Sequence, residues 1–466
     1  MPDDFRQHAH RVADWIADYL ENPERYPVLS RVAPGEVRAS LPPSAPEHGE
    51  PFDAIFADFE RVIVPGLTHW NHPGFFAYFA ITGSEPGVLA EFLCAALNVQ
   101  AMLWRTSPAA TELEEVALAW LRQLLGLPAS FEGVIYDTAS VSTLHALAAA
   151  REAVVPDARG AGLAARPDVP PLRVYCSEHA HSSVDKAVML LGLGHRALRR
   201  IPADAEFRMR PSLLAQAIAE DRRAGIRPMA IVPTVGTTSS TSVDPVDDIA
   251  AICRREQIWM HVDAAYAGVA AMVPGFEWIL RGAGGADSIV VNPHKWLFTP
   301  FDLSVLYCRR MDLVRQAFSL TPEYLRTSEG EAGVKNLMDT GIQLGRRFRA
   351  LKLWMVLRHF GAAGLRAHLA EHMRLARLFA SWVERSDFFE LAAPVPFSVV
   401  CFRLRGSASD EEHQRILDAV NASGEVFLSH TKLHDRYVLR LAIGNLRTAE
   451  RHVVRAWELL EMAARQ

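Results

Sequence analysis

The chain has 466 residues, of which half are apolar and 22% are charged, and its net charge is -5. This length and composition indicate a soluble globular protein with a large core and two or three structural units. The charge gives no reason to expect a nucleic-acid partner. The longest apolar runs are too short, or too often interrupted by charge, to span a membrane.

The cysteines and the first residues predict the cellular compartment. The five cysteines are widely scattered and have neither the spacing of a metal site nor that of a disulfide framework. Residues 1–6 contain no apolar signal core. We therefore expect a cytoplasmic protein without a metal site.

The N-terminal region is predicted to be helical. Residues 4–21 carry Phe5, Val12, Trp15 and Ile16 at the spacing of one helix face. A Pro-rich connector leads to a second helix over 52–64. These two helices cannot form a core by themselves, so we expect them to lie across another part of the protein, such as a second subunit. A further helical pattern covers 86–125.

The middle of the chain alternates short apolar strands with helices. This rhythm predicts an α/β unit with a mostly parallel sheet. The predicted strands are 133–136, 172–176, 229–233, 258–262, 288–291 and 303–308, and the predicted helices are 140–154, 182–191, 246–255 and 277–280.

The C-terminal part reads as a smaller α/β unit. Its predicted helices are 365–386 and 448–464, and its predicted strands are 397–404, 426–429 and 437–442; a long helix predicted over 345–360 precedes this unit. The expected organisation is an N-terminal helical segment over 1–80, a large domain over 81–352 and a small domain over 353–466.

Two charged residues follow apolar strands of the predicted sheet. Asp263 ends the strand at 258–262, and Lys295 comes shortly after the strand at 288–291. Buried charges are costly unless they are paired or used, and one cofactor needs both. Pyridoxal phosphate forms a Schiff base with a lysine amine, and a carboxylate keeps its pyridine nitrogen protonated. The pair therefore predicts a pyridoxal phosphate site, and ligands of such sheets bind beyond the carboxyl ends of the strands.

Other polar residues at strand ends allow two interpretations each. Thr138 and Ser140 either cap a helix or bind the phosphate at its N-terminus, and the nearby Asp263 and Lys295 favour phosphate. His181 is either structural or stacks on the pyridine ring. His294 either donates to phosphate or fills space, and Thr238 is a turn residue or a neighbour of the ring.

Two further segments suit a substrate. Residues 70–79 are dense in aromatic side chains and broken by Pro73 and Gly74, which fits either a core or a pocket for a flat apolar group. Tyr324 lies in a polar loop without regular periodicity, where it is either a buried aromatic on a lid or a catalytic phenol.

These motifs, in this order, resemble the group II pyridoxal-phosphate decarboxylases, and within them the aromatic L-amino acid decarboxylases. The resemblance covers nearly the whole chain. It implies the type I pyridoxal-phosphate fold, as an intertwined homodimer in which the N-terminal helices cross the partner. The segments that carry it are 76–79, 107–114, 180–183, 261–268, 292–296 and 344–349.

The resemblance also implies residue roles. Lys295 would bind the cofactor and Asp263 its ring nitrogen, while His181 would stack on the ring and meet the substrate carboxylate. Tyr324 would close over the substrate on a mobile loop and donate a proton. The implied cofactor contacts are Thr138, Ala139, Ser140, His181, Thr238, Asp263, Ala265, Asn292, His294 and Lys295. The implied substrate contacts are Trp70, Tyr78, Phe79, Ile81, Gln100, Met102 and Gly345, with Gln100 and Met102 reaching in from the neighbouring subunit.

The implied reaction is decarboxylation of an aromatic L-amino acid, namely tryptophan, 5-hydroxytryptophan, tyrosine, phenylalanine or DOPA. Ile81 and Met102 stand where animal members have threonine and phenylalanine, which makes the pocket less suited to a catechol, whereas Gly345 leaves room for an indole. One alternative is an aromatic acetaldehyde synthase, which the presence of Tyr324 and His181 disfavours. Another is a non-catalytic binding protein, which Lys295 and Asp263 disfavour.

Overall fold

The structure is a computed structural model that describes residues 3–164, 166–320, 333–406 and 408–466. The chain divides into two compact units. One unit comprises residues 81–376 and 393–401, and the other comprises residues 1–80, 377–392 and 402–466.

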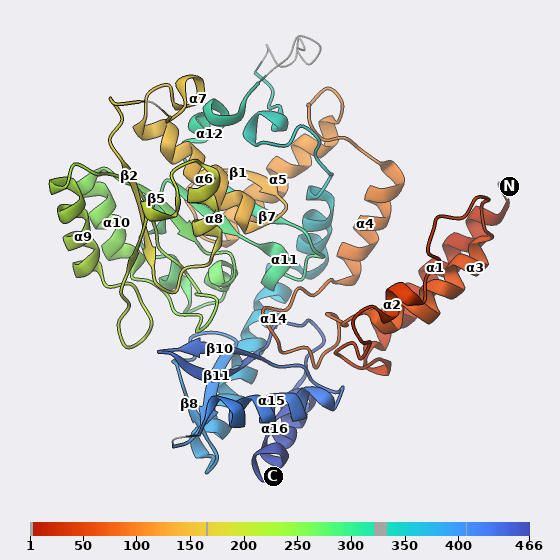
Figure 1. Cartoon of the computed structure of the whole chain (residues 1–466). Helices are drawn as coiled ribbons and strands as arrows, with labels where there is room; N and C mark the ends of the chain where they lie inside the picture. Colours follow the sequence, from red (N-terminus) through yellow and green to blue (C-terminus); the bar gives the residue numbers. More distant parts are fainter. Residues whose placement is uncertain (1–2, 165, 321–332, 407) are drawn as a thin grey trace. The chain divides into compact units, whose positions relative to one another are not determined.

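The larger unit is built on a seven-stranded sheet with the strand order β1-β7-β6-β5-β4-β2-β3. Strands β1, β2, β5 and β7 of this sheet are labelled in Figure 1. The sheet is parallel from β6 through β5, β4 and β2 to β3, and β7 runs antiparallel between β6 and β1. The mostly parallel sheet predicted from the sequence is thus confirmed. The strands are β1 (Glu132–Tyr136), β2 (Leu172–Ser177), β3 (Leu198–Ile201), β4 (Arg227–Val232), β5 (Trp259–Asp263), β6 (Ser288–Val291) and β7 (Ser304–Cys308).

Helices connect the parallel strands and cover the sheet. The chain moves one way along the sheet through β1, β2 and β3, and the opposite way through β3, β4 and β5. Because parallel crossovers are right-handed, the helices of the first run lie on one face and those of the second on the other. The helices of this unit are α4 (Glu85–Leu97), α5 (Pro108–Leu124), α6 (Ala139–Val154), α7 (Ala158–Ala161), α8 (Ser183–Leu190), α9 (Pro211–Arg223), α10 (Val246–Glu256), α11 (Pro293–Trp296) and α12 (Met311–Phe318).

The smaller unit contains a four-stranded sheet with the order β10-β11-β9-β8. A cluster of aromatic rings fills its core, formed by Phe379, Phe389, Phe402 and Trp457. The long helix α14 (Ala350–Arg385) begins in the larger unit and ends in the smaller one, and it is interrupted at Gly361, whose φ of +59° is not helical. The other elements are α1 (Asp3–Glu21), α2 (Glu36–Ala39), α3 (Phe52–Asp58), α15 (Asp410–Ala422), α16 (Glu450–Ala464), β8 (Phe389–Leu391), β9 (Val399–Leu404), β10 (Ser429–Leu433) and β11 (Arg436–Ala442).

One predicted strand of the smaller unit is wrong. Val426 and Leu428 are buried and Phe427 is half-buried, but Phe427 forms only an isolated bridge with Phe75. The regular strand begins later, with Ser429. Gly74 allows the close approach of the two segments, because a Cβ there would lie 2.1 Å from the carbonyl oxygen of Glu425.

The N-terminal helices pack on each other. Arg11 on α1 forms an ion pair with Asp53 at 2.7 Å, and Trp15 meets Phe59 edge-on. Even so, most of α1 is exposed or half-buried, and Phe5 is 78% exposed. Within the described ranges, no helix is both long and apolar enough to cross a membrane.

A buried ion pair joins α5, β1 and the segment before α14. Arg346 and Glu114 are only 7% and 3% exposed, and their charged atoms approach to 2.9 Å. Arg346 also donates to the carbonyl of Ile135 at 2.7 Å, and Glu114 accepts the N–H of the same residue at 2.9 Å. Removing one member of such a pair leaves the other charge buried and unpaired.

We predict that Arg346→Ala lowers the free energy of unfolding by about 3–5 kcal/mol. The matched control is Arg347→Ala, since Arg347 is exposed in its ion pair with Glu91, and it should cost less than about 1 kcal/mol. Urea denaturation of both variants tests this. If both variants lost the same free energy of unfolding, burial would not be what makes the ion pair of Arg346 with Glu114 strong.

Candidate active site

Polar residues collect where the parallel strands end. Strands β1, β2, β4, β5 and β6 run in the same direction, so their carboxyl ends lie at one edge of the sheet. Ligands of α/β sheets bind at this edge. The segments that follow these strands contain Ser140, His181, Thr238, Asp263 and Lys295, all expected from the sequence.

Asp263 and Lys295 are held on neighbouring strands. Asp263 is the last residue of β5, and its side chain accepts the N–H of Ala265 at 3.1 Å. Lys295 lies half-buried in α11, the turn that follows β6. Two backbone hydrogen bonds tie these segments together, from Ala264 to Val290 and from Asn292 to Ala265, each 3.0 Å long. The segments that carry a buried carboxylate and an amine are therefore held next to each other.

His181 belongs to the same cluster. Loss of water contact lowers the pKa of its ring, while Asp263 raises that pKa and Lys295 lowers it, so both charges lie near the imidazole. Ring atom Nδ1 accepts the N–H of Ser183 at 3.1 Å, which orients the ring. In the neutral ring the proton is therefore on Nε2, which remains able to donate.

The start of α6 is available to an anion. In the described part of the chain, no side chain caps this helix, and the hydroxyl of Thr138 bonds instead to Asp137 at 3.1 Å. Ala139 packs on Ala265 and Val290, so the helix start adjoins the segment after β5. The helix dipole and the free first-turn N–H groups favour a phosphate here. This arrangement supports the phosphate interpretation of the sequence over the capping one.

Asn292 and His294 form a buried pair beside Lys295. Burial is the main reason that the pKa of His294 is lowered, to about 3, so the ring is neutral. Its Nδ1 accepts the N–H of Leu303 at 2.8 Å, which leaves the proton on Nε2. The amide nitrogen of Asn292 lies 3.2 Å from Nε2, and its oxygen has no partner among the described residues. The amide nitrogen of Asn292 and the protonated Nε2 of His294 are both donors and cannot bond to each other. We therefore assign the Asn292 amide in the rotated orientation, in which its oxygen accepts the N–H of Nε2. This geometry suits a histidine that orients Asn292.

The loop after β4 closes another side of the site. Its backbone pairs with the end of β5, where Val235 donates to the carbonyl of Asp263 at 2.8 Å. Thr238 is exposed.

Asp244, which was not expected from the sequence, is buried and accepts the N–H groups of Thr234 and Met209 at 2.8 and 2.7 Å. Burial raises its pKa to about 7. A single Asp in a loop gives no sequence signal for this structural role.

Three expected substrate residues lie in the larger unit, and two of them, Gln100 and Gly345, are close together. Gln100 accepts the N–H of Arg346 at 2.7 Å, and a Cβ at Gly345 would lie 3.2 Å from the Gln100 amide nitrogen. Met102 packs against Leu103 and Met338.

The aromatic residues of the expected pocket lie in the smaller unit. Trp70 stacks on Tyr78 with the ring centroids 6.0 Å apart, and Arg440 lies over Phe79. Ile81, the first residue of the larger unit, is half-buried. Tyr324 is outside the described residues.

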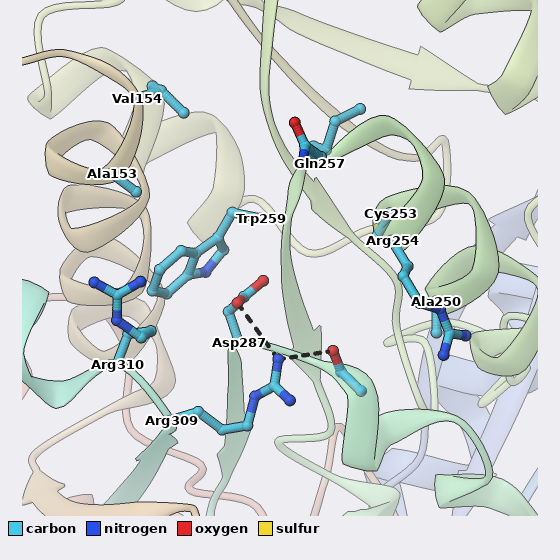
Figure 2. Close-up of a pocket in the computed structure, with 12 residues that line it drawn as sticks. Ala153, Val154, Ala250, Cys253, Arg254, Gln257, Trp259, Asp287, Arg309 and Arg310 are labelled. Atoms are coloured by element: carbon cyan, nitrogen blue, oxygen red, sulfur yellow. Dashed lines mark hydrogen bonds and ion pairs between the residues drawn. The ribbon is translucent and has the colours of Figure 1, made fainter.

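A separate pocket of about 380 Å³ lies at the other edge of the sheet (Figure 2). It is bordered by the starts of β5 and β6 and the end of β7, including Trp259, Asp287 and Arg309. Arg309 is 3.7 Å from Asp287 and donates to the carbonyl of Gly285 at 3.3 Å. Its lining contains neither Asp263 nor Lys295, so this pocket is not the candidate site.

The convergence at the carboxyl edge fits pyridoxal phosphate. An uncapped helix start suits its phosphate, a buried carboxylate suits its ring nitrogen, and an adjacent lysine suits its aldehyde. In the described ranges, no group of three or more metal-binding side chains is present.

Comparison with known proteins gives full-length matches. A family model described as "Pyridoxal-dependent decarboxylase conserved domain" matches residues 34–405. Tryptophan decarboxylase 2 of Oryza sativa subsp. japonica is 41% identical over 98% of this chain and 93% of its own. Phenylacetaldehyde synthase of Arabidopsis thaliana is 41% identical over 99% and 96%. The crystal structure of Oryza sativa TDC with PLP and tryptamine has a TM-score of 0.96 at 38% identity, covering 100% of this chain and 98% of that one.

We predict that Lys295→Ala folds but loses the visible absorbance that pyridoxal phosphate gives when bound to a lysine. Lys295 follows β6, next to the strand that ends at Asp263, and Lys335, Lys352 and Lys432 lie in ion pairs elsewhere in the chain. Lys186→Ala is the matched control, because this exposed lysine lies in α8. Absorbance spectra of the three proteins test the assignment, and an unchanged spectrum of Lys295→Ala would contradict it.

Proposed function

We propose that this chain, which belongs to the pyridoxal-dependent decarboxylase family, converts an aromatic L-amino acid to its aryl amine and carbon dioxide. The family, the type I fold and the pyridoxal phosphate cofactor are confirmed as predicted. The observation that carries the proposal is the meeting of His181, Asp263 and Lys295 at one edge of the sheet. The aromatic substrate class is supported by relatives whose names specify aromatic substrates or products.

The site residues would hold the cofactor at both ends. The start of α6, with Thr138, Ala139 and Ser140, would hold the phosphate together with Asn292, and His294 would orient the Asn292 amide. Asp263 would keep the ring nitrogen protonated. Ala265 would pack on one face of the ring, and Thr238 would lie beside it. When bound, pyridoxal phosphate supplies the electron sink that stabilises negative charge at the substrate α-carbon.

His181 and Lys295 act on the substrate. Lys295 would hold the cofactor through its amine, at the place where the substrate amine is bound. The neutral ring of His181, which carries its proton on Nε2, would stack on the cofactor and donate to the substrate carboxylate. Decarboxylation requires the carboxylate bond to stand perpendicular to the conjugated system. Contacts with the aromatic side chain would fix this orientation, so that binding energy is converted into geometry.

The substrate side chain would be bound by residues of two kinds. Trp70, Tyr78 and Phe79 supply aromatic surface, and Ile81 adds an aliphatic contact. Gly345 would also contact the substrate, together with Gln100 of the partner subunit and Met102 of the partner subunit. A Cβ at Gly345 would lie 3.2 Å from the Gln100 amide nitrogen, so a larger residue here would crowd that side chain. Tyr324 would donate the proton to the α-carbon.

The test of this proposal is product analysis with a substrate panel of tryptophan, 5-hydroxytryptophan, tyrosine, phenylalanine and DOPA. We expect carbon dioxide and the amine from at least one of them, and no release from glutamate, the non-aromatic control. Tyr324→Phe should shift the product toward aldehyde, ammonia and peroxide when oxygen is present, because protonation is slowed. Aldehyde as the main product of the unmodified protein would contradict the proposal and favour the synthase alternative.

We further propose that the active protein is a homodimer in a reducing compartment, the cytoplasm. The face of α4 that carries Leu89, Phe92, Leu93 and Leu97 is apolar and exposed, which supports a subunit interface there. Most of α1 is exposed or half-buried, so this helix would form a second contact with the partner. The partner would supply Gln100 and Met102 to the pocket. All five cysteines are free, which is consistent with reducing conditions.

For the dimer, we predict the mass of two chains by light scattering, and dissociation or precipitation of Leu93→Glu, which places a charge at the interface. The matched control is Leu190→Glu, because Leu190 is 73% exposed on α8. A fully active monomer, or equal behaviour of the two variants, would overturn the proposal.

A further inference from the structure

The two ends of the cofactor site lie on different elements. The phosphate-binding segment starts α6, whereas the carboxylate that meets the ring nitrogen ends β5. A rigid ligand gains from both anchors only when the protein keeps their separation fixed. The contacts that join α6 to β5 beneath the site are therefore important for binding.

His261 lies between these elements. Its side chain is fully buried, and ring atom Nε2 is 3.4 Å from the hydroxyl of Thr143 on α6. Ring atom Nδ1 is 2.9 Å from the hydroxyl of Ser288, the first residue of β6. One imidazole thus joins α6, β5 and β6, which carry the helix start, Asp263 and the approach to Lys295.

The direction of the His261 side chain matches that of Asp263. Residues two apart on a strand point to the same face, and the bond to Thr143 shows that this is the face covered by α6. Thr143 is one helical turn after Ala139, which packs on Ala265. The hydrogen bond between His261 and Thr143 therefore lies one helical turn behind the contact between Ala139 and Ala265, which borders the site.

The network is buried and uncharged. Burial lowers the pKa of His261 to about 4, although the nearby Asp263 partly opposes this. Thr143 and Ser288 are also fully buried. Trp259 donates from its indole nitrogen to Ser288 at 3.1 Å. Loss of the imidazole would leave the Thr143 hydroxyl without this buried partner, which is costly.

We propose that His261 is a positioning residue that sets the separation between the phosphate-binding start of α6 and Asp263. It acts through Thr143 and Ser288 and does not touch the cofactor. This role concerns cofactor binding alone, so it does not depend on which amino acid is the substrate.

The experiment measures the dissociation constants of the apoenzyme for pyridoxal phosphate, for pyridoxal and for inorganic phosphate. His261→Phe keeps a ring of similar size but loses both hydrogen bonds. We expect its dissociation constant for pyridoxal phosphate to rise about tenfold, which corresponds to one buried hydrogen bond. The constants for pyridoxal and phosphate, each of which uses one anchor, should change less than about twofold, because each anchor is intact.

The matched control is Tyr307→Phe. Tyr307 is also fully buried in the larger unit, and its hydroxyl makes one hydrogen bond of 2.8 Å, to the carbonyl of Leu118. This variant should leave all three constants unchanged. A rise in the control equal to that of His261→Phe would show general destabilisation and overturn the proposal.

Thr143→Val provides a second and milder variant, which keeps the test decisive if His261→Phe does not fold. It should weaken pyridoxal phosphate binding selectively, and the double variant with His261→Phe should be no weaker than His261→Phe alone. Unchanged binding in Thr143→Val, additive effects in the double variant, or a parallel loss of pyridoxal binding would each refute the role.

Discussion

The placement of two opposite charges on adjacent parallel strands is the constraint on which the rest of the site depends. Asp263 ends β5 and Lys295 follows β6, and the two segments are held together by backbone hydrogen bonds. The parallel sheet makes this possible because all its carboxyl ends meet at one edge. The helix start of α6, the ring of His181 and the loop after β4 surround that pair. The sheet therefore places Asp263 near Lys295, and the residues around this pair would bind the rest of the cofactor and the substrate.

Much of the fold could be predicted because the central strands are continuous apolar runs bounded by polar turns. All six strands expected in the larger unit are present, whereas β3 (Leu198–Ile201) was missed. This edge strand contains Arg199 and Arg200, which form ion pairs with Glu220 and Asp185, so it lacks the apolar pattern of a central strand. The strand expected at 426–429 was wrong, since burial of an apolar run does not by itself require strand pairing.

The candidate site was partly predictable for the same reason. Asp263 and Lys295 are conspicuous as charges at the ends of apolar strands, and their roles, like those of the other site residues, remain proposals. The supporting residues were not predictable. His261, Thr143 and Ser288 are ordinary residues in sequence, and only the tertiary structure brings them together. Likewise, nothing in the sequence distinguishes a histidine that binds phosphate from His294, whose hydrogen bonds to Leu303 and Asn292 suit orientation.

The central claim, that Lys295 carries the cofactor, is tested most directly by chemical trapping. The chain contains five lysines, namely Lys186, Lys295, Lys335, Lys352 and Lys432. Borohydride reduction of the protein with bound pyridoxal phosphate makes the lysine linkage permanent, and peptide mass spectrometry then locates it. We predict one phosphopyridoxyl group per chain, on Lys295. Labelling of another lysine, or no labelling, would contradict it.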